Sequence, residues 1–244
     1  MKLLSLFDGI AGFPLAGAMH GIEPVYASEI EPFCVRVTKL RFPKMIHLGS
    51  VTDINGADLE PCDIVSFGSP CQDLSVAGNQ LGIHEGQRSS LFFEAIRIIK
   101  EMREHDRASG RSDIDIRPRF GVWENVPGAL HSNGGADFRA VLEAFCKVCD
   151  PTASVPVPKG NRWLPAGCIV GNGFSIAWRI LDAQYYGVPQ RRKRIYLVAD
   201  FGSERAGEIQ FVGESVPWDS QTGGEAAKRV AAHAEGSADG SGGQ

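Results

Sequence analysis

The sequence predicts an α/β protein built on a doubly wound, mostly parallel sheet. Short apolar runs rich in β-branched or aromatic residues alternate with segments in which apolar residues recur at helical spacing. This order is typical of βαβ units, whose strands run parallel. With 244 residues, 43% of them hydrophobic, the chain is long enough to bury one sizeable core. In such a sheet, ligands bind beyond the carboxyl ends of the strands.

The elements follow in order along the chain. The first strand is expected over residues 2–7, and the first helix over residues 13–20, where Gly21 closes it. Two longer helices are expected over residues 89–105 and 137–149, where apolar residues recur at helical spacing. Further strand candidates, each short and apolar, cover residues 24–28, 63–67, 120–123 and 194–199.

Two segments break the alternation of strands and helices. Residues 151–167 contain four prolines and are expected to form an irregular surface excursion within a domain that spans residues 1–218. Residues 219–244, mostly Gly, Ala and Ser, are expected to be a disordered low-complexity tail.

Composition narrows the class of protein. No apolar run approaches the length of a membrane span or of a signal peptide, so a cytoplasmic protein is expected. Its six cysteines are then expected to be reduced thiols. The net charge of −4 gives no general attraction to nucleic acid, so binding to DNA requires a local basic surface. The basic run at residues 191–194 is the candidate.

A glycine-containing loop follows the first strand and indicates a cofactor site. The loop, Phe7-Asp8-Gly9-Ile10-Ala11-Gly12, lets a ligand approach the backbone closely, although glycine turns of this kind are also common without a ligand. The second strand ends at Glu29, about 20 residues further on, where dinucleotide-binding folds place the carboxylate that binds ribose hydroxyls. Together the two features favour a nucleotide-like cofactor.

Two more loops at the same sheet edge carry reactive groups. Gly68-Ser69-Pro70-Cys71-Gln72 directly follows a strand, and its rigid, polar surroundings favour a reactive thiol over a packing cysteine. Glu124 ends the strand at residues 120–123 and precedes Asn125. It is either a capping residue or a carboxyl group placed to deliver a proton near Cys71.

In order and spacing, these motifs and Gln190-Arg191-Arg192-Lys193-Arg194 resemble those of the C5-cytosine DNA methyltransferase family, over about the first 200 residues. The resemblance implies a Rossmann-like fold of the S-adenosylmethionine-dependent methyltransferase type. It also implies methyl transfer from S-adenosylmethionine to C5 of a cytosine flipped out of double-stranded DNA, as in the DNA methylation of restriction-modification systems.

The resemblance assigns the catalytic roles. Cys71 corresponds to the nucleophile that adds to C6, and Glu124 to the group that protonates or hydrogen-bonds N3. Arg194 corresponds to the arginine that holds O2, with Arg192 beside it. Residues 75–88 match a loop that closes over DNA, or are a flexible linker. The substrate contacts implied by the resemblance are Gln72, Ser75, Gly78, Arg88, Asn125 and Gln190.

The resemblance also assigns the cofactor contacts. It places the methionine end of S-adenosylmethionine against the glycine loop, the ribose on Glu29 and the adenine on Ile30. Many family members carry an aspartate after a glycine to bind the adenine amino group, whereas this chain has Ser50 after Gly49. The cofactor contacts implied are Phe7, Asp8, Gly9, Ile10, Gly12, Glu29, Ile30, Ser50 and Pro70.

Family members continue into a target-recognition region and a last conserved segment, which have no counterpart after Trp218. We therefore expect a split enzyme whose second polypeptide supplies these parts, or else a truncated product. A non-catalytic remnant that binds S-adenosylmethionine or DNA, and an RNA cytosine-5 methyltransferase, are the alternatives. Cys146, Cys149 and Cys168 lack a suitably spaced fourth zinc ligand, so no metal is expected.

Overall fold

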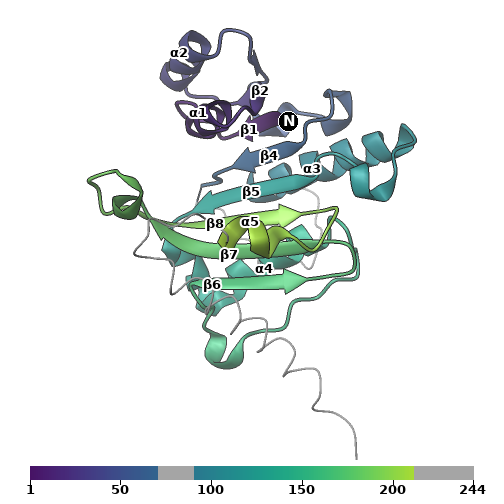
Figure 1. The fold of residues 1–244 in the computed structure, drawn as a ribbon, viewed down its shortest axis with the longest axis vertical. Helices are drawn as coiled ribbons and strands as arrows, with labels where there is room; N and C mark the ends of the chain where they lie inside the picture. Colours follow the sequence, from purple (N-terminus) through teal and green to yellow (C-terminus); the bar gives the residue numbers. More distant parts are fainter. Residues whose placement is uncertain (71–90, 212–244) are drawn as a thin grey trace, which may run out of the picture.

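The computed structural model describes residues 1–70 and 91–211, which form one eight-stranded sheet with helices on both faces (Figure 1). The strands lie side by side in the order β3-β2-β1-β4-β5-β8-β7-β6. Their bounds are β1 Lys2–Leu6, β2 Glu23–Ser28, β3 Ile46–His47, β4 Ile64–Phe67, β5 Phe120–Asn125, β6 Ala166–Val170, β7 Ser175–Asp182 and β8 Lys193–Asp200.

The sheet is mixed in direction. β3, β2, β1, β4 and β5 pair in parallel, whereas β8 is antiparallel to β5, β7 to β8 and β6 to β7. This arrangement confirms the predicted α/β, doubly wound class, since β1 lies inside the sheet and the chain winds outward from it in both directions. All five predicted strands are present, while β3, β6 and β7 were not predicted.

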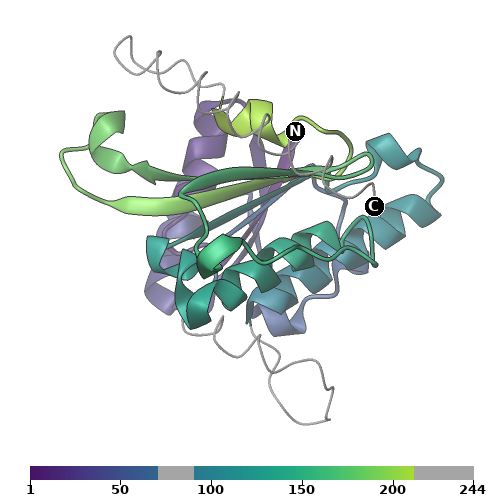
Figure 2. The same cartoon turned by 90° about the horizontal axis from the view of Figure 1, so that it is seen from below.

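Helices cover both faces of the sheet. α3 and α4 lie together on one face and α5 lies on the other (Figure 2). The helices are α1 Gly12–Met19, α2 Pro32–Arg41, α3 Leu91–Ala108, α4 Ala136–Cys146 and α5 Ala206–Phe211. Short 3₁₀ helices are η1 Val51–Asp53, η2 Gly56–Asp58, η5 Asp113–Asp115, η6 Pro127–Leu130, η7 Ser132–Gly135, η8 Lys159–Asn161 and η9 Ala183–Tyr186. The three predicted helices match α1, α3 and α4 with ends shifted by up to a turn.

An aromatic layer fills the space between the sheet and the α3 and α4 helices. Phe67 on β4 and Trp123 on β5 point to this face and are fully buried. The Phe67 ring stacks on Phe145 of α4 at 6.0 Å between centroids, and Trp123 stacks on Phe138 at 6.2 Å. Burying side chains of this size is the main stabilising term of the fold. It fixes the two strands whose ends lead into the predicted catalytic loops.

The predicted excursion at residues 151–167 is irregular for most of its length but is tied to the body of the protein. Trp163 is buried, and its indole Nε1 donates a hydrogen bond to the Gly135 carbonyl at 2.8 Å. β6 begins at Ala166, within the predicted excursion. Among the helices of the described residues, none is both long and apolar enough to cross a bilayer.

Candidate active site

The predicted motifs meet at one edge of the sheet. β1, β2, β4 and β5 are parallel, so the loops that follow them all leave from the same edge. Because β8 is antiparallel to β5, its first residues lie at this edge too. Cys71, Gln72, Ser75, Gly78 and Arg88 lie outside the described residues. The predicted residues that the structure does describe lie at or after the ends of β1 to β5 or near the start of β8, and so are distributed along this edge on both sides of Pro70.

The carboxylate of Glu29 holds the first loop to the end of β2. One oxygen, Oε2, accepts a hydrogen bond from the Gly9 N–H at 2.7 Å, and Oε1 accepts from the N–H groups of Ile30 at 2.8 Å and Glu31 at 2.9 Å. Glu29 therefore fixes the shape of the glycine loop, in addition to its predicted contact with the ribose. Since a carboxylate offers about four acceptor sites, it can still accept from a ligand hydroxyl.

The loop leaves its outer side open. Gly9 has a φ of 56°, a left-handed conformation that favours glycine, and a Cβ built at Gly9 or Gly12 would meet no atom within 4 Å. Beside the loop, the side chains of Ile10 and Ile30 are 49% and 75% exposed. An open backbone surface, a carboxylate and exposed apolar side chains fit a ligand that carries ribose hydroxyls and an adenine ring.

Asp8 points into the protein and joins the loop to α2. Its side chain is buried, and Oδ2 accepts a hydrogen bond from Thr38 Oγ1 at 3.3 Å, while Oδ1 has no hydrogen-bond partner among the described residues. Burial raises the pKa of the Asp8 carboxyl, and the nearby Glu29 carboxylate raises it further. Thr38 was not predicted, because a threonine within a helix carries no signal of such a contact.

Ser50, the predicted adenine contact, lies next to the end of β2. Ser28 Oγ donates to the Gly49 carbonyl at 2.6 Å, which places Ser50 near the cofactor edge. Its Oγ accepts a hydrogen bond from the Thr52 N–H at 3.3 Å and caps η1. The Ser50 hydroxyl thus has a structural role in addition to the predicted one.

Asn125 fixes the chain segment that leads into Cys71. Its side chain is 4% exposed, and its Nδ2 donates to the Ser69 carbonyl at 3.1 Å. Trp123 Nε1 donates to Ser69 Oγ at 3.3 Å. These bonds hold the backbone up to Pro70 against the end of β5 and give Asn125 an anchoring role beside its predicted contact with substrate.

Glu124 and Arg194 form an ion pair across two strands. Arg194 Nε lies 2.8 Å from Glu124 Oε1, and the two side chains are 21% and 24% exposed. The pairing follows from the register, because Glu124 lies opposite Tyr196, and Arg194 precedes Tyr196 by two residues on the same sheet face. Gly68 leaves room for the pair, since a Cβ there would lie 3.0 Å from Glu124 Oε2.

A cavity of about 260 Å³ lies next to this ion pair. One of the residues that line this cavity, Tyr196, was not predicted. Burial raises the pKa of the Tyr196 hydroxyl, and the Glu124 carboxylate raises it further. The backbone N–H of Arg192 donates to Asp182 Oδ1 at 3.0 Å, which fixes its position at the cavity. The lining residues are Leu181, Ala183, Tyr186, Val188, Arg192, Arg194 and Tyr196.

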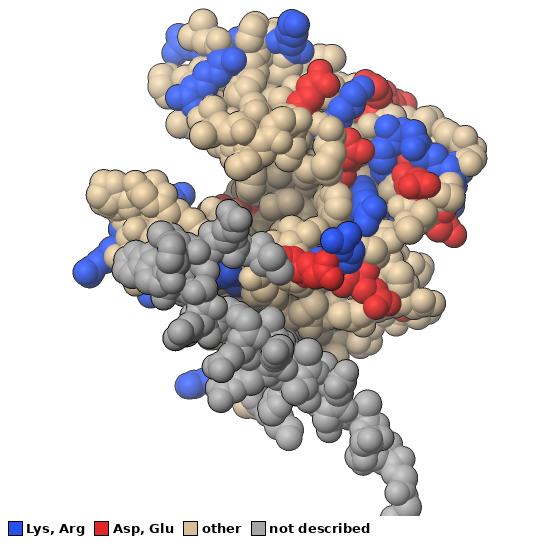
Figure 3. All heavy atoms as spheres, viewed as in Figure 1, with Lys and Arg blue, Asp and Glu red and all other residues tan. Residues whose placement is uncertain are grey.

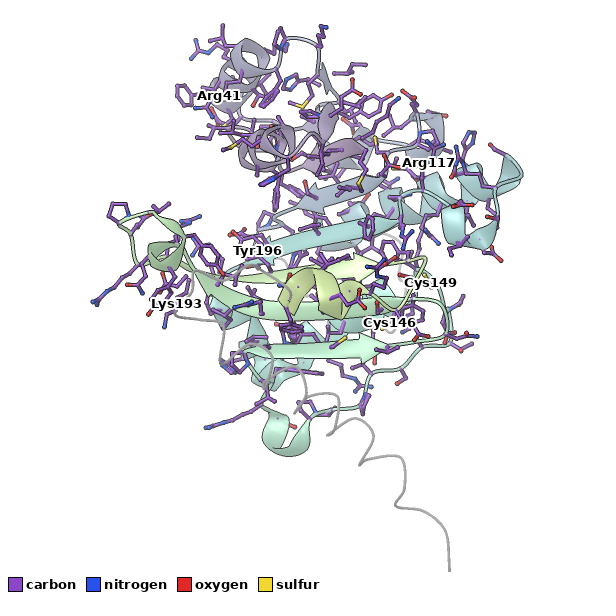
Figure 4. The ribbon with its side chains drawn as sticks, viewed as in Figure 1. Arg41, Arg117, Cys146, Cys149, Lys193 and Tyr196 are labelled. Atoms are coloured by element: carbon purple, nitrogen blue, oxygen red, sulfur yellow. The ribbon has the colours of Figure 1, made fainter. Side chains whose placement is uncertain are left out.

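The cysteines Cys146 and Cys149 lie away from the beginning of β8, where Lys193 is found (Figure 4). Burial raises the pKa of Cys146 to about 11, and Cys149 Sγ lies 3.6 Å from the Phe201 carbonyl. Among residues 1–70 and 91–211, no three His, Cys, Asp or Glu side chains are placed to hold a metal ion.

Comparison with known proteins gives the family. The model of the C-5 cytosine-specific DNA methylase family matches residues 1–148 and 170–219. The chain belongs to this family. The cofactor is S-adenosylmethionine, and the residues around Glu29 fit it.

Curated relatives of this methylase-family chain are longer than it. It is 33% identical to the DNA N-6-adenine-methyltransferase of Escherichia phage P1, over 80% of this chain and 28% of the relative. It is 28% identical to the type II methyltransferase M.NgoBV of Neisseria gonorrhoeae, over 84% of this chain and 42% of the relative. It is 26% identical to the type II methyltransferase M.MspI of Moraxella sp, over 81% of this chain and 38% of the relative. The chain thus spans less than half the length of these relatives.

Solved structures share the fold of this methylase-family chain. The S. pombe Dnmt2 methyltransferase superposes with a TM-score of 0.55 at 17% identity, over 82% of this chain and 50% of that one. A putative DNA modification methyltransferase encoded within an E. coli prophage gives a TM-score of 0.54 at 20% identity, over 82% and 46%. These matches confirm the Rossmann-like methyltransferase fold.

Proposed function

We propose that this chain is the catalytic part of a DNA (cytosine-5-)-methyltransferase. It transfers a methyl group from S-adenosylmethionine to C5 of a cytosine flipped out of duplex DNA. The observation that carries the proposal is the Glu124–Arg194 pair, which lies beside the anchored loop that leads into Cys71 and at the same sheet edge as the cofactor loop. A carboxyl and a guanidinium in contact can bind two adjacent atoms of one cytosine, N3 and O2.

In the proposed mechanism the Cys71 thiolate forms a bond to C6 of the cytosine. Electron density moves into the ring, and Glu124 protonates or hydrogen-bonds N3 while Arg194 donates to O2. S-adenosylmethionine supplies the methyl group that C5 then takes. Loss of the C5 proton to water restores the double bond, breaks the bond between C6 and sulfur and returns Cys71 as thiolate, while N3 returns its proton to Glu124.

The same residues favour methylation at C5 over methylation at an exocyclic amine. An amino group carries its own lone pair, so its methylation needs no nucleophile that adds to the ring. A nucleophilic thiol together with a group that neutralises N3 is what a reaction needs when the ring is activated by addition. The name of the phage P1 relative makes N6-methyladenine the product to test against.

We propose that the choice of DNA sequence depends on protein outside these 244 residues. The support is that the curated relatives are more than twice as long as the part that this chain matches. We predict that this additional protein is a second polypeptide. We also predict that the enzyme acts in restriction-modification, in the cytoplasm. Addition of the candidate partner should then raise both trapping and sequence selectivity.

The test uses DNA that contains 5-fluorocytosine and tritiated S-adenosylmethionine. Fluorine at C5 cannot leave as a proton, so the adduct persists and retains the tritiated methyl group. A covalent complex that is absent in Cys71→Ala supports the mechanism. Trapping that survives Cys71→Ala, trapping on RNA of the same sequence but not on DNA, or N6-methyladenine as the product on unmodified DNA would each overturn it.

A further inference from the structure

The hairpin between β7 and β8 projects beyond the sheet at the edge that carries the site (Figures 1 and 2). It comprises residues 183–193, here called the β7–β8 hairpin. η9 forms its first part, and Gly187, with a φ of 77°, makes the turn that follows. Its base is therefore next to the Glu124–Arg194 pair, while its tip extends into solvent.

The hairpin is basic, although the chain as a whole has a net charge of −4. Residues 183–193 contain no acidic residue, and Arg191, Arg192 and Lys193 are exposed. Within the described residues no carboxylate forms an ion pair with any of these three side chains. Figure 3 shows basic atoms at the hairpin, whereas most acidic atoms in that view lie over the opposite side. Such unpaired cations are suited to bind phosphate groups.

The hairpin also exposes aromatic side chains. Tyr185 and Tyr186 are each 60% exposed, and Val188 is 47% exposed. Tyr186 and Val188 line the 260 Å³ cavity together with Arg194. Exposed aromatic rings interspersed with exposed cations form a surface on which unstacked nucleic-acid bases can pack.

The base of the hairpin is held in place. The buried carboxylate of Asp182 accepts from the Arg192 N–H at 3.0 Å and from Gln184 Nε2 at 2.8 Å. The Ala183 N–H donates to the Arg192 carbonyl at 3.0 Å. Because these bonds fix the base of the hairpin before DNA arrives, the residues at the base lose little conformational freedom when DNA binds.

We propose that the β7–β8 hairpin is a DNA-binding arm, in which Arg191 and Lys193 contact phosphates beside the target cytosine and Tyr185 and Tyr186 stack on bases unstacked by flipping. This inference rests on the proposed function, since it takes DNA as the substrate. When one base is flipped out, the faces of the neighbouring bases become exposed. The β7–β8 hairpin projects from the sheet edge that carries the site and can therefore contact these faces.

The first test measures the salt dependence of DNA binding with the 244-residue chain and a fluorescent duplex. Each lost phosphate contact reduces the slope of log K against log salt by about one. Lys193→Ala and Arg191→Ala should each show this reduction. Lys44→Ala, which removes an exposed charge far along the chain from the hairpin, should leave the slope unchanged.

The second test uses a duplex in which the target cytosine is mismatched and therefore easily unstacked. Tyr185→Ala should weaken binding to it by roughly tenfold. Tyr185→Phe keeps the ring and should bind like the parent chain. Unchanged affinity in Tyr185→Ala together with unchanged salt slopes in the cation variants would overturn the arm and favour a protein partner on this surface. So would failure of the parent chain to bind DNA at low salt.

The two proposals fail separately. If trapping on 5-fluorocytosine depends on Cys71 but the hairpin variants bind DNA normally, the arm is wrong and the proposed function stands. If the variants lose DNA binding but the parent chain forms no covalent complex either alone or with the candidate partner, the arm is supported and the proposed reaction is wrong. Unchanged unfolding midpoints show that the variants are folded.

Discussion

Arg194 Nε lies 2.8 Å from Glu124 Oε1 and so joins the start of β8 to the end of β5. The two strands are antiparallel neighbours, and the pair lies on the sheet face opposite the aromatic layer. It is therefore held by backbone register and not only by its own attraction, which for a partly exposed pair contributes little. Glu124 and Arg194 can therefore give up their contact with each other and bind a substrate instead, with little loss of stability.

Replacing the carboxylate tests the role of this pair. Glu124→Gln should lower the rate of methyl transfer by roughly a hundredfold to ten-thousandfold, because the amide cannot protonate N3. S-adenosylmethionine binding should be retained. Glu208→Gln is the matched control, since Glu208 of α5 forms an exposed ion pair of 2.7 Å with Arg205, and neither residue lines the cavity. Equal rates in the two variants would contradict a catalytic role for Glu124.

The position of the Glu124 carboxylate is predicted to require a glycine at residue 68. A methyl group added by Gly68→Ala would lie 3.0 Å from Glu124 Oε2, so the carboxylate has to move. We expect a loss of activity of up to about tenfold, since the carboxylate has to shift by a few tenths of an ångström and displacements of about 1 Å cost roughly a hundredfold. Gly128→Ala is the control, because the nearest atom to its Cβ is 3.9 Å away. The rates at which the two variants trap DNA are compared by stopped flow. Equal rates for Gly68→Ala and Gly128→Ala would show that residue 68 does not crowd the Glu124 carboxylate.

Asn125 is predicted to stabilise the loop that leads into Cys71. Asn125→Ala leaves the Ser69 carbonyl and the Val126 N–H without their partners, so the free energy of unfolding should fall by about 1–3 kcal/mol. Urea unfolding measures this change. Asn172→Ala, at an exposed position, should have no measurable effect. A stable Asn125→Ala chain that traps DNA normally would leave Asn125 without an anchoring role.

Glu29 is predicted to control cofactor affinity. Glu29→Gln replaces one acceptor oxygen by a donor that faces backbone N–H groups, so binding of S-adenosylmethionine should weaken tenfold or more, about 1.5–3 kcal/mol. Isothermal titration calorimetry gives the affinity directly. Glu31→Gln changes a carboxylate two residues further on, which accepts from the Phe33 N–H at 3.4 Å, and this variant should bind the cofactor normally.

The buried Asp8 carboxyl predicts a dependence of stability on pH. Burial raises its pKa in the folded chain above the ordinary value of 3.8, so the folded state binds this proton more tightly than the unfolded state. The stabilisation is fully present below the ordinary pKa and is lost as pH rises through the raised pKa. Relative to Asp8→Asn, the parent chain should thus lose stability as the pH rises above the ordinary pKa of 3.8 and through the raised pKa. A difference in unfolding free energy that stays constant over this range would exclude the effect.

Much of the parallel half of the fold was predictable from sequence, because buried strands and amphipathic helices have distinct periods. β6 and β7 were not predicted, because β6 begins inside the proline-containing residues 151–167 and β7, Ser175–Asp182, does not alternate strictly between apolar and polar residues. The direction of β8 was not predictable from its composition, since a strand buried on both faces has the same apolar pattern in either direction.

The site residues were identified by motif, but their contacts were not. Nothing in the sequence shows that Arg194 contacts Glu124, because that contact depends on the register of β8 against β5. Asn125 was predicted from its place in a motif, whereas its bond to Ser69 requires the spacing of β4 and β5. Tyr196 gave no signal, since an aromatic residue in a strand is usually a packing residue.

The path of α5 bears on how this chain can be joined to another protein. The helix begins at Ala206, whose N–H donates to Ser175 Oγ at the far end of β7, and Gln210 near its end donates to the Tyr196 carbonyl. The chain therefore leaves the described fold at Phe211 on the reactive side, whereas Met1 enters at the opposite edge through β1. A DNA-targeting module fused after residue 211 needs only a short tether to reach the substrate, while the same module fused before residue 1 has to span the depth of the sheet.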